Sequence, residues 1–123
     1  MKPQTLLMIT EGGHKKGDVL AIARIAGIMS CKKTSNLIPL CHPISIDSVT
    51  IDFIIHEDNN SIEITAECKT SNKTGIEMEA LTAVSISGLT VYDMCKSVDK
   101  SIHLSNIELV HKSGGKSGIY NKK

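Results

Sequence analysis

The sequence predicts an α+β fold in which two helices pack on one face of an antiparallel sheet. Residues 49–55 and 62–68 alternate apolar and polar side chains with the two-residue period of a half-buried strand. Residues 19–33 and 76–98 are longer and carry few charges in their middle, which is typical of helices that are buried on more than one side. With one more strand near the C-terminus, the order helix, strand, strand, helix, strand matches a βαββαβ unit whose first strand is not found.

Two helices are expected before the first strand. Pro3 can begin a short helix through the run QTLLMI, because proline is tolerated where the first-turn N–H has no partner. A charged, glycine-rich loop follows at residues 11–18, and Asp18 can cap the helix of residues 19–33. Arg24 is the one charge in the middle of that helix, which indicates that most of its circumference is buried.

The rest of the chain predicts a hairpin, a helix and a last strand. Residues 34–45 contain two prolines and are expected to be irregular. Residues 49–68 form a hairpin around the turn HEDNN, and the second long helix follows at 76–98. The last strand is expected near residues 102–110, before a flexible basic tail at 112–123. Since no repeat or linker interrupts the chain, all 123 residues form a single domain.

Composition excludes several classes of function. The 14 Lys and Arg residues nearly balance the 13 Asp and Glu residues, which argues against nucleic-acid binding through bulk positive charge. With one Phe, two Tyr and no Trp, the chain lacks side chains on which nucleotide bases could stack. No apolar stretch is long enough for a membrane span or a secretory signal, so we expect a cytoplasmic protein with reduced cysteines. These cysteines, none of them in a CxxC pair, are Cys31, Cys41, Cys68 and Cys95.

The long helices also predict an oligomer. Two helices on one sheet normally each expose a polar stripe to water, but residues 80–92 carry no charge at all. The missing burial is most simply supplied by other subunits, so that helix faces meet between chains. The alternative is a weakly polar, solvated face formed by the serines and threonines at 82, 85, 87 and 90.

Charged residues stand at the two ends of the second long helix. Glu79 and Asp93 would lie on one face but about 21 Å apart along the axis, so a shared site needs Glu79 and Asp93 from two different chains. Asp93 and Lys96 can meet directly, either as a surface ion pair or as a lysine that exchanges protons. Glu77 and Glu79 also have a structural role available, because carboxylates in a first turn interact favourably with the helix dipole.

Cys41 and His42 form a second candidate group, in the proline-rich stretch. Adjacent residues rarely chelate one metal, and no other Cys or His pair has ligand spacing, so a metal site is not expected. A histidine in a turn flanked by proline is better suited to hydrogen-bond a substrate, or else a local backbone carbonyl.

The basic segment KSGGKSG, residues 112–118, ends like a phosphate-binding P-loop. That motif needs an earlier glycine, where this chain has Val110, and a following helix, for which too few residues remain. It is therefore not a P-loop. Its two lysines could still fold over phosphates, or they could belong to a solvated terminus.

Three of these segments resemble a known family. KGDVLAIARIAGIMSCKKTSNLIPLCHP, KTGIEMEALTAVSISGLTVYDMCKSVDK and KSGGKSG are similar to the signature segments of the cyclic pyranopterin monophosphate synthase family, the MoaC proteins of molybdenum-cofactor biosynthesis. The resemblance extends from about Pro3 to Gly118, and its motifs are long and ungapped. It implies a ferredoxin-like fold and a hexamer, built as a trimer of dimers with active sites at the dimer interface.

The resemblance also implies a substrate and a set of site residues. The substrate would be 3′,8-cyclo-7,8-dihydro-GTP, and the products cyclic pyranopterin monophosphate and pyrophosphate, by acid–base chemistry without a redox cofactor. A divalent cation accompanying the triphosphate is left open. By position in the motifs, the catalytic residues would be Lys16, Asp93 and Lys96. The substrate-binding residues would be Leu40, Cys41, His42, Glu77, Met78, Glu79, Lys112 and Lys116.

Two further expectations follow from the resemblance. If Lys16 and Lys96 lie close together, each should depress the pKa of the other, giving one neutral base and one charged acid near pH 7. Family members usually have two or three dozen residues before the position of Met1, including a first strand, so the first strand of the unit is in doubt in this chain. That difference is the one feature in favour of a non-catalytic homologue, whereas the presence of Lys16, Asp93 and Lys96 favours an enzyme.

Overall fold

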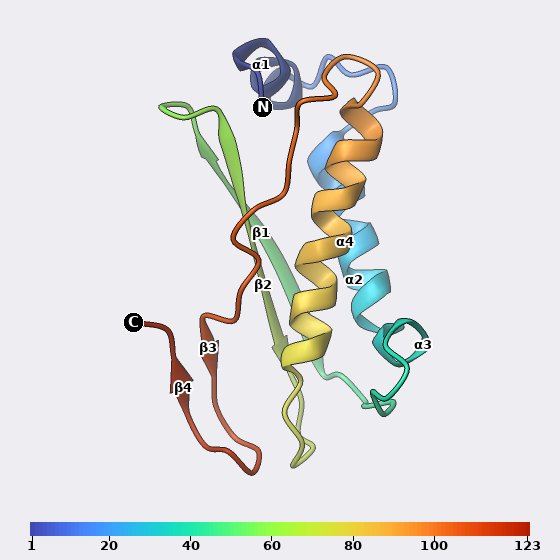
Figure 1. Ribbon diagram of the computed structural model, residues 1–123. Coiled ribbons are helices and arrows are strands. Elements are labelled where there is room, and N and C mark those ends of the chain that lie inside the picture. Colours follow the sequence, from blue (N-terminus) through green and yellow to red (C-terminus); the bar gives the residue numbers. More distant parts are fainter.

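The computed structural model describes all residues from Met1 to Lys123, and it places two helices on one face of a β-hairpin. Helices α2 (Val19–Cys31) and α4 (Glu77–Cys95) run antiparallel and pack together, α2 facing strand β1 (Ser48–His56) and α4 facing strand β2 (Ser61–Lys69) (Figure 1). The predicted α+β class, with helices against an antiparallel sheet, is confirmed. The remaining elements are α1 (Pro3–Glu11), α3 (Thr34–Leu37), β3 (His111–Lys112) and β4 (Tyr120–Asn121).

The hairpin has the register that its alternating pattern predicts. Ile51 pairs with Ala66 and Phe53 with Ile64, so the apolar residues of both strands share the face that the helices cover. Ile51 is 1% exposed, whereas the intervening residues Asp52 and Thr65 are exposed on the other face. A slip of one residue would reverse these faces, so burial fixes the register.

The predicted cap of α2 is present, and Arg24 explains how a charge is tolerated on this helix. The Asp18 carboxylate accepts a hydrogen bond from the Ala21 N–H at 3.1 Å, which satisfies one of the unpaired donors of the first turn. Arg24 Nε donates to the Ile51 carbonyl oxygen at 2.8 Å, and its guanidinium group lies 5.4 Å from the centre of the Phe53 ring. The single charge of α2 therefore ties the helix to the hairpin.

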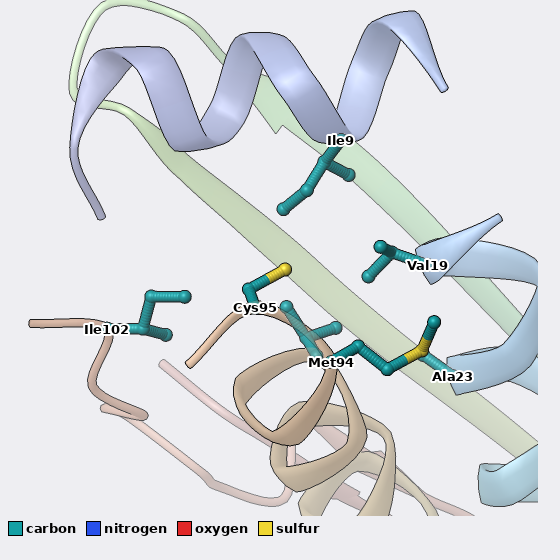
Figure 2. Packing of buried hydrophobic residues seen from close by; sticks show 7 residues of the cluster. Ile9, Val19, Ala23, Met94, Cys95 and Ile102 are labelled. Carbon is teal, nitrogen blue, oxygen red and sulfur yellow. The ribbon is translucent and has the colours of Figure 1, made fainter. Parts of the chain in front are cut away.

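The largest core cluster lies where α1, the start of α2 and the end of α4 meet. Figure 2 shows Ile9, Val19, Met94 and Ile102 converging from these segments around Cys95. A second, smaller cluster of Cys31, Ile51 and Ala83 lies farther along the two helices, against the hairpin. One core cluster therefore lies near each end of the helix pair. The candidate site residues also lie at these two ends.

The loop after α4 fastens the N-terminus. The Asp99 carboxylate accepts hydrogen bonds from the Lys2 N–H and the Thr5 hydroxyl, both at 2.9 Å, and from Ser101. Asp99 is 1% exposed, and these donors hold the pKa of its carboxyl group well below its usual range, the Lys2 N–H contributing most. A charged side chain thus adds to the apolar packing of Ile9 in linking α1 to the rest of the chain.

Two expectations about secondary structure are wrong. Residues 102–110 form no strand: they run past the α4 side of the hairpin, where Leu104 packs close to Gly88, but they join no ladder (Figure 1). A strand is defined by backbone hydrogen bonds to a neighbour, and this segment forms none with either strand of the hairpin. Residues 34–37, expected to be irregular, form the short helix α3, in which the Thr34 hydroxyl donates to the Cys31 carbonyl oxygen at 2.8 Å.

The C-terminal segment folds back as a small hairpin. Strand β3 pairs with β4, and Lys122 N–H also donates to the Val110 carbonyl oxygen at 2.9 Å. This hairpin lies beside the start of α4 and the loop before it, far from α1 (Figure 1). The flexibility expected for residues 112–123 stays a prediction.

Candidate functional site

The predicted site residues fall into two groups at opposite ends of α4 (Figure 1). We call the first group, Lys16, Asp93 and Lys96, the lysine end. The second group, the glutamate end, consists of Leu40, Cys41, His42, Glu77, Met78, Glu79, Lys112 and Lys116. Because Glu79 and Asp93 are separated by fourteen positions of one continuous helix, the two ends are about 21 Å apart.

The lysine end is an exposed cluster of charges. Lys96 Nζ lies 2.9 Å from an Asp93 carboxylate oxygen, and Lys16 Nζ lies 3.4 Å from the Asp93 backbone carbonyl oxygen. The Lys96 ammonium group, with a further contribution from Lys16, lowers the pKa of the Asp93 carboxyl group. Asp93 in turn raises the pKa of Lys96. The expected depression of the Lys96 pKa by Lys16 is therefore wrong within one chain, where the Asp93 carboxylate is the largest influence on Lys96.

A histidine that sequence reasoning missed shapes the Lys16 loop. His14 Nδ1 accepts a hydrogen bond from the Lys16 N–H at 3.0 Å, and the His14 carbonyl oxygen accepts from the Gly17 N–H at 3.1 Å. Gly17 has φ of +104°, a conformation that side chains with a Cβ rarely adopt. Together these features make a tight turn that presents Lys16 to α4. In the sequence, the feature that could have indicated this role is the position of His14 between the glycines and lysines of GGHKKGD.

The glutamate end lines an open pocket of about 680 Å³. Its walls are residues 38–44, residues 72–75 and the first turn of α4. Five of the predicted residues line it: Leu40, Cys41, His42, Met78 and Glu79. Three polar residues that sequence reasoning missed, Asn72, Lys73 and Thr74, line it as well, and the only signal for them was their place directly before the glutamates.

Glu79 is the buried carboxylate of this pocket. Only 3% of it is exposed, and the Cys41 thiol, 3.8 Å away, is its hydrogen-bond donor. Burial, together with the Glu79 charge, raises the pKa of the Cys41 thiol, so this cysteine stays protonated and can donate. Leu40, in contrast, is 93% exposed at the rim, where an incoming ligand could cover it.

Lys112 connects the C-terminal hairpin to Glu77. Its Nζ lies 3.3 Å from a Glu77 carboxylate oxygen and 3.0 Å from the Ser117 hydroxyl, and its side chain is 17% exposed. A Cβ at Gly75 would stand 2.5 Å from Lys112 Cε and 2.6 Å from Glu77 Oε2, so a larger residue there would require one of these two side chains to move. Lys116 lies in the exposed turn between β3 and β4 and forms no ion pair.

The arrangement suits acid–base chemistry at one end and ligand binding at the other. Lysine and aspartate side chains at the lysine end can exchange protons, and the pocket at the glutamate end offers thiol, imidazole, carboxylate and ammonium groups. No group of three or more His, Cys, Asp or Glu side chains is placed to hold a metal ion. None of the helices is both long enough and apolar enough to cross a membrane.

Known proteins are similar to this chain over nearly its whole length. The model of the MoaC family matches residues 1–115. A cyclic pyranopterin monophosphate synthase of Thermoanaerobacter sp. (strain X514) is 55% identical over 122 residues, which cover 99% of this chain and 77% of the relative. Proteins of the same name from Syntrophomonas wolfei and Heliobacterium modesticaldum are 56% and 54% identical, covering 96% and 98% of this chain and 75% and 76% of their own length. The matched segment contains both ends of the candidate site, and the chain belongs to the MoaC family.

Proposed function

We propose that this chain is a cyclic pyranopterin monophosphate synthase, a lyase of molybdenum-cofactor biosynthesis. It converts 3′,8-cyclo-7,8-dihydro-GTP to cyclic pyranopterin monophosphate and releases pyrophosphate. The observation that carries the proposal is the sequence identity of at least 54% to the three synthases compared above, over almost all of the chain. The non-catalytic alternative is not retained, because Lys16, Asp93 and Lys96 are all present and grouped together.

Proton transfer is assigned to the lysine end. Lys96 is held protonated by Asp93, which suits it to donate a proton to a leaving group or a developing oxyanion. Lys16 contacts the backbone carbonyl of the same aspartate, from a loop whose turn is fixed by His14. The proposed chemistry is a rearrangement followed by phosphoryl cyclisation, and it requires no redox cofactor from the protein. A divalent ion that neutralises the triphosphate would arrive with the substrate.

Recognition of the substrate is assigned to the glutamate end. The pocket lined by Cys41, His42 and Glu79 offers the donors and acceptors that a purine ring requires. Lys112 and Lys116 supply positive charge for the phosphates, and Lys73 adds a third ammonium group at the pocket wall. Local lysines thus provide the charge that a nearly neutral chain lacks overall.

We also propose that a complete active site needs two chains. The lysine and glutamate ends of one chain are too far apart to hold one nucleotide, but a neighbouring chain could bring its own lysine end to this pocket. Support comes from α2, where Ile22, Ile25 and Met29 form an exposed apolar stripe that suits a subunit interface. The expected assembly is a hexamer, built as a trimer of dimers, in the cytoplasm.

The direct test is to incubate the purified protein with 3′,8-cyclo-7,8-dihydro-GTP and to measure pyrophosphate and the pterin product together. The proposal expects both, in equal amounts. Lys96→Ala should abolish turnover, whereas Lys100→Ala, which removes an exposed lysine outside the site, should leave it intact. Equal pyrophosphate release by the wild type and Lys96→Ala would contradict the catalytic role of Lys96. Elution of the wild-type protein as a stable monomer in size-exclusion chromatography would contradict the hexamer.

A further inference from the structure

Two of the four cysteines lie in contact, although they are 37 residues apart in the sequence. Cys31 Sγ and Cys68 Sγ are 3.3 Å apart, in a structure in which all four thiols are reduced. Cys31 is the last residue of α2 and is 1% exposed, and Cys68 is half-buried near the end of β2. A disulfide bond is about 2.05 Å long, so the sulfur atoms need to approach by only about 1.2 Å.

The pair stands at the base of both walls of the pocket. The chain leads from Cys31 through α3 to the wall of residues 38–44, and from Cys68 directly to the wall of residues 72–75. The residues next to the two walls are already joined, because the Thr70 hydroxyl donates to the Ser45 carbonyl oxygen at 2.7 Å. Any bond between the two sulfur atoms therefore acts on the segments that shape the pocket.

We propose that Cys31 and Cys68 are a redox-reactive pair that forms a reversible disulfide when the protein meets a low-molecular-weight disulfide such as oxidised glutathione. Neither cysteine belongs to the catalytic or substrate-binding residues assigned above. Disulfides inside cells are usually transient, which is the behaviour expected of a pair that is reduced at rest.

The exchange proceeds in two balanced steps. The Cys68 thiolate attacks one sulfur of the small disulfide, forming a mixed disulfide and releasing one thiolate. Cys31 then loses its proton and attacks the Cys68 sulfur, which completes the protein disulfide and releases the second thiolate. The two protein thiols are oxidised, the small disulfide is reduced to two thiols, and the two protons from the cysteines are taken up by the released thiolates.

The surroundings assign the roles of the two cysteines. The hydrogen bond with Cys31 lowers the pKa of Cys68, so Cys68 is the thiolate that reacts first. The same contact, together with burial, raises the pKa of Cys31. Cys68 is also the more accessible of the two, whereas Cys31 can be reached only by a neighbouring sulfur. This division matches an attacking and a resolving cysteine.

A consequence for the pocket rests on the proposed function. The Glu79 charge contributes to raising the pKa of Cys41, which it contacts, and the pKa of Cys31. At Cys68 it only partly opposes the lowering of the pKa by Cys31. We expect part of the approach of the two sulfur atoms to be passed on to the segments that lead into the pocket walls. A misplacement of about 1 Å can cost up to ~10²-fold in rate. The oxidised protein should therefore have a kcat/KM at least several-fold lower than the reduced protein, restored by dithiothreitol.

The test oxidises the folded protein and counts its free thiols after unfolding. The full chain is equilibrated with oxidised glutathione and then unfolded in guanidinium chloride with excess iodoacetamide, because Cys31 and Cys95 are buried in the folded chain. The intact mass and the digested peptides are then measured. The proposal expects two of the four thiols to be alkylated, a linked peptide joining Cys31 to Cys68, and four alkylated thiols after dithiothreitol. Cys31→Ser should retain glutathione on Cys68, and Cys41→Ser, the matched control, should still form the linked peptide.

Four alkylated thiols at every ratio of oxidised to reduced glutathione would overturn the proposal, and so would a linked peptide that contains Cys41 or Cys95. Both readouts use the wild-type chain, so they do not depend on how well a variant folds. A disulfide that leaves kcat/KM unchanged would contradict the coupling to the pocket. Lack of turnover by the reduced protein would instead contradict the proposed function, while the thiol count would still decide the disulfide.

Discussion

The Lys16 ammonium group lies 3.4 Å from the Asp93 backbone carbonyl oxygen, across 77 residues of sequence. The contact brings the glycine-rich loop before α2 to the last turn of α4, where Asp93 also pairs with Lys96. Two lysines thus flank one aspartate on a rigid helix end. This cluster of Lys16, Asp93 and Lys96 explains why charged residues stand at this end of α4. The role of each of the three residues can be tested separately.

Asp93→Asn should lower kcat on the order of 10²-fold, within the range of general acid–base effects. It should also move the alkaline limb of the kcat/KM profile to lower pH. The Asp93 carboxylate stabilises the protonated form of Lys96 and so raises its pKa, and removing that charge lets Lys96 lose its proton at lower pH. Steady-state rates across pH check this, with Asp47→Asn as the control at an exposed site. An alkaline limb at the wild-type position would show that Lys96 is not the titrating acid.

Lys112→Met should raise KM about tenfold or more with little change in kcat, because a hydrogen bond between charged groups contributes about 1.5–3 kcal/mol. The lysine is already held beside the pocket by Glu77 and Ser117, so it should bind phosphates without reorganisation. Lys116→Met is the matched comparison: it removes an exposed lysine of the same hairpin, and its effect on KM should be smaller. A larger increase in KM for Lys116→Met than for Lys112→Met would show that Lys116, and not Lys112, is the main phosphate ligand.

Gly27→Ala should destabilise the fold by about 1–3 kcal/mol, the usual cost of overpacking a core. A Cβ at this position would overlap Ile51 Cδ1 and Ser87 Oγ and stand 3.0 Å from the Ala83 carbonyl oxygen, where α2, α4 and β1 meet. Urea unfolding measures the loss. Gly13→Ala is the control, since a Cβ there meets nothing within 4 Å. Equal midpoints for the two variants would mean that the helices do not pack this closely.

Asp99→Asn should lower the Tm at pH 7 by several degrees and flatten its dependence on acid pH. Hydrogen bonds hold the folded-state pKa of the Asp99 carboxyl group below the unfolded value of about 3.9. Its contribution to stability is therefore fully present above about pH 4 and is lost as the pH falls through the lowered pKa. Thermal melts from pH 7 to pH 2 check this, with the exposed turn residue Asp58 changed to Asn as the control. Parallel Tm curves for the wild type and Asp99→Asn would contradict it.

Local signals in the sequence predict most of the fold. Asp18 before an apolar run predicts the start of α2, and alternation with a polar turn predicts the β1–β2 register, because both depend on neighbours in the sequence. The strand expected at 102–110 is wrong because pairing depends on a distant edge, which alternation alone does not supply. The sequence does not predict helix α3, because the prolines at 39 and 43 favour extended backbone in the residues before them and a single helical turn has no periodicity of its own.

The candidate site is predictable only where helix geometry decides it. The distance between Glu79 and Asp93 follows from the helical rise, and the Asp93–Lys96 pair follows from their spacing. The contact of Lys112 with Glu77 forms because the C-terminal hairpin packs against Gly75 and the start of α4. No local pattern in the sequence predicts this long-range packing. The direction of the Lys96 pKa shift depends on which charge is nearest, and that requires coordinates.

The measurement that tests the central claim most directly mixes two inactive variants. Glu79→Gln damages the glutamate end and Lys96→Ala the lysine end, so each protein alone should be nearly inactive. If every site combines the two ends from different chains, random reassociation of equal amounts should leave roughly a quarter of the sites intact, by the two-fold symmetry of the dimer. The account predicts that the mixture regains about this fraction of wild-type turnover. A mixture no more active than the average of the two variants would contradict a site shared between chains.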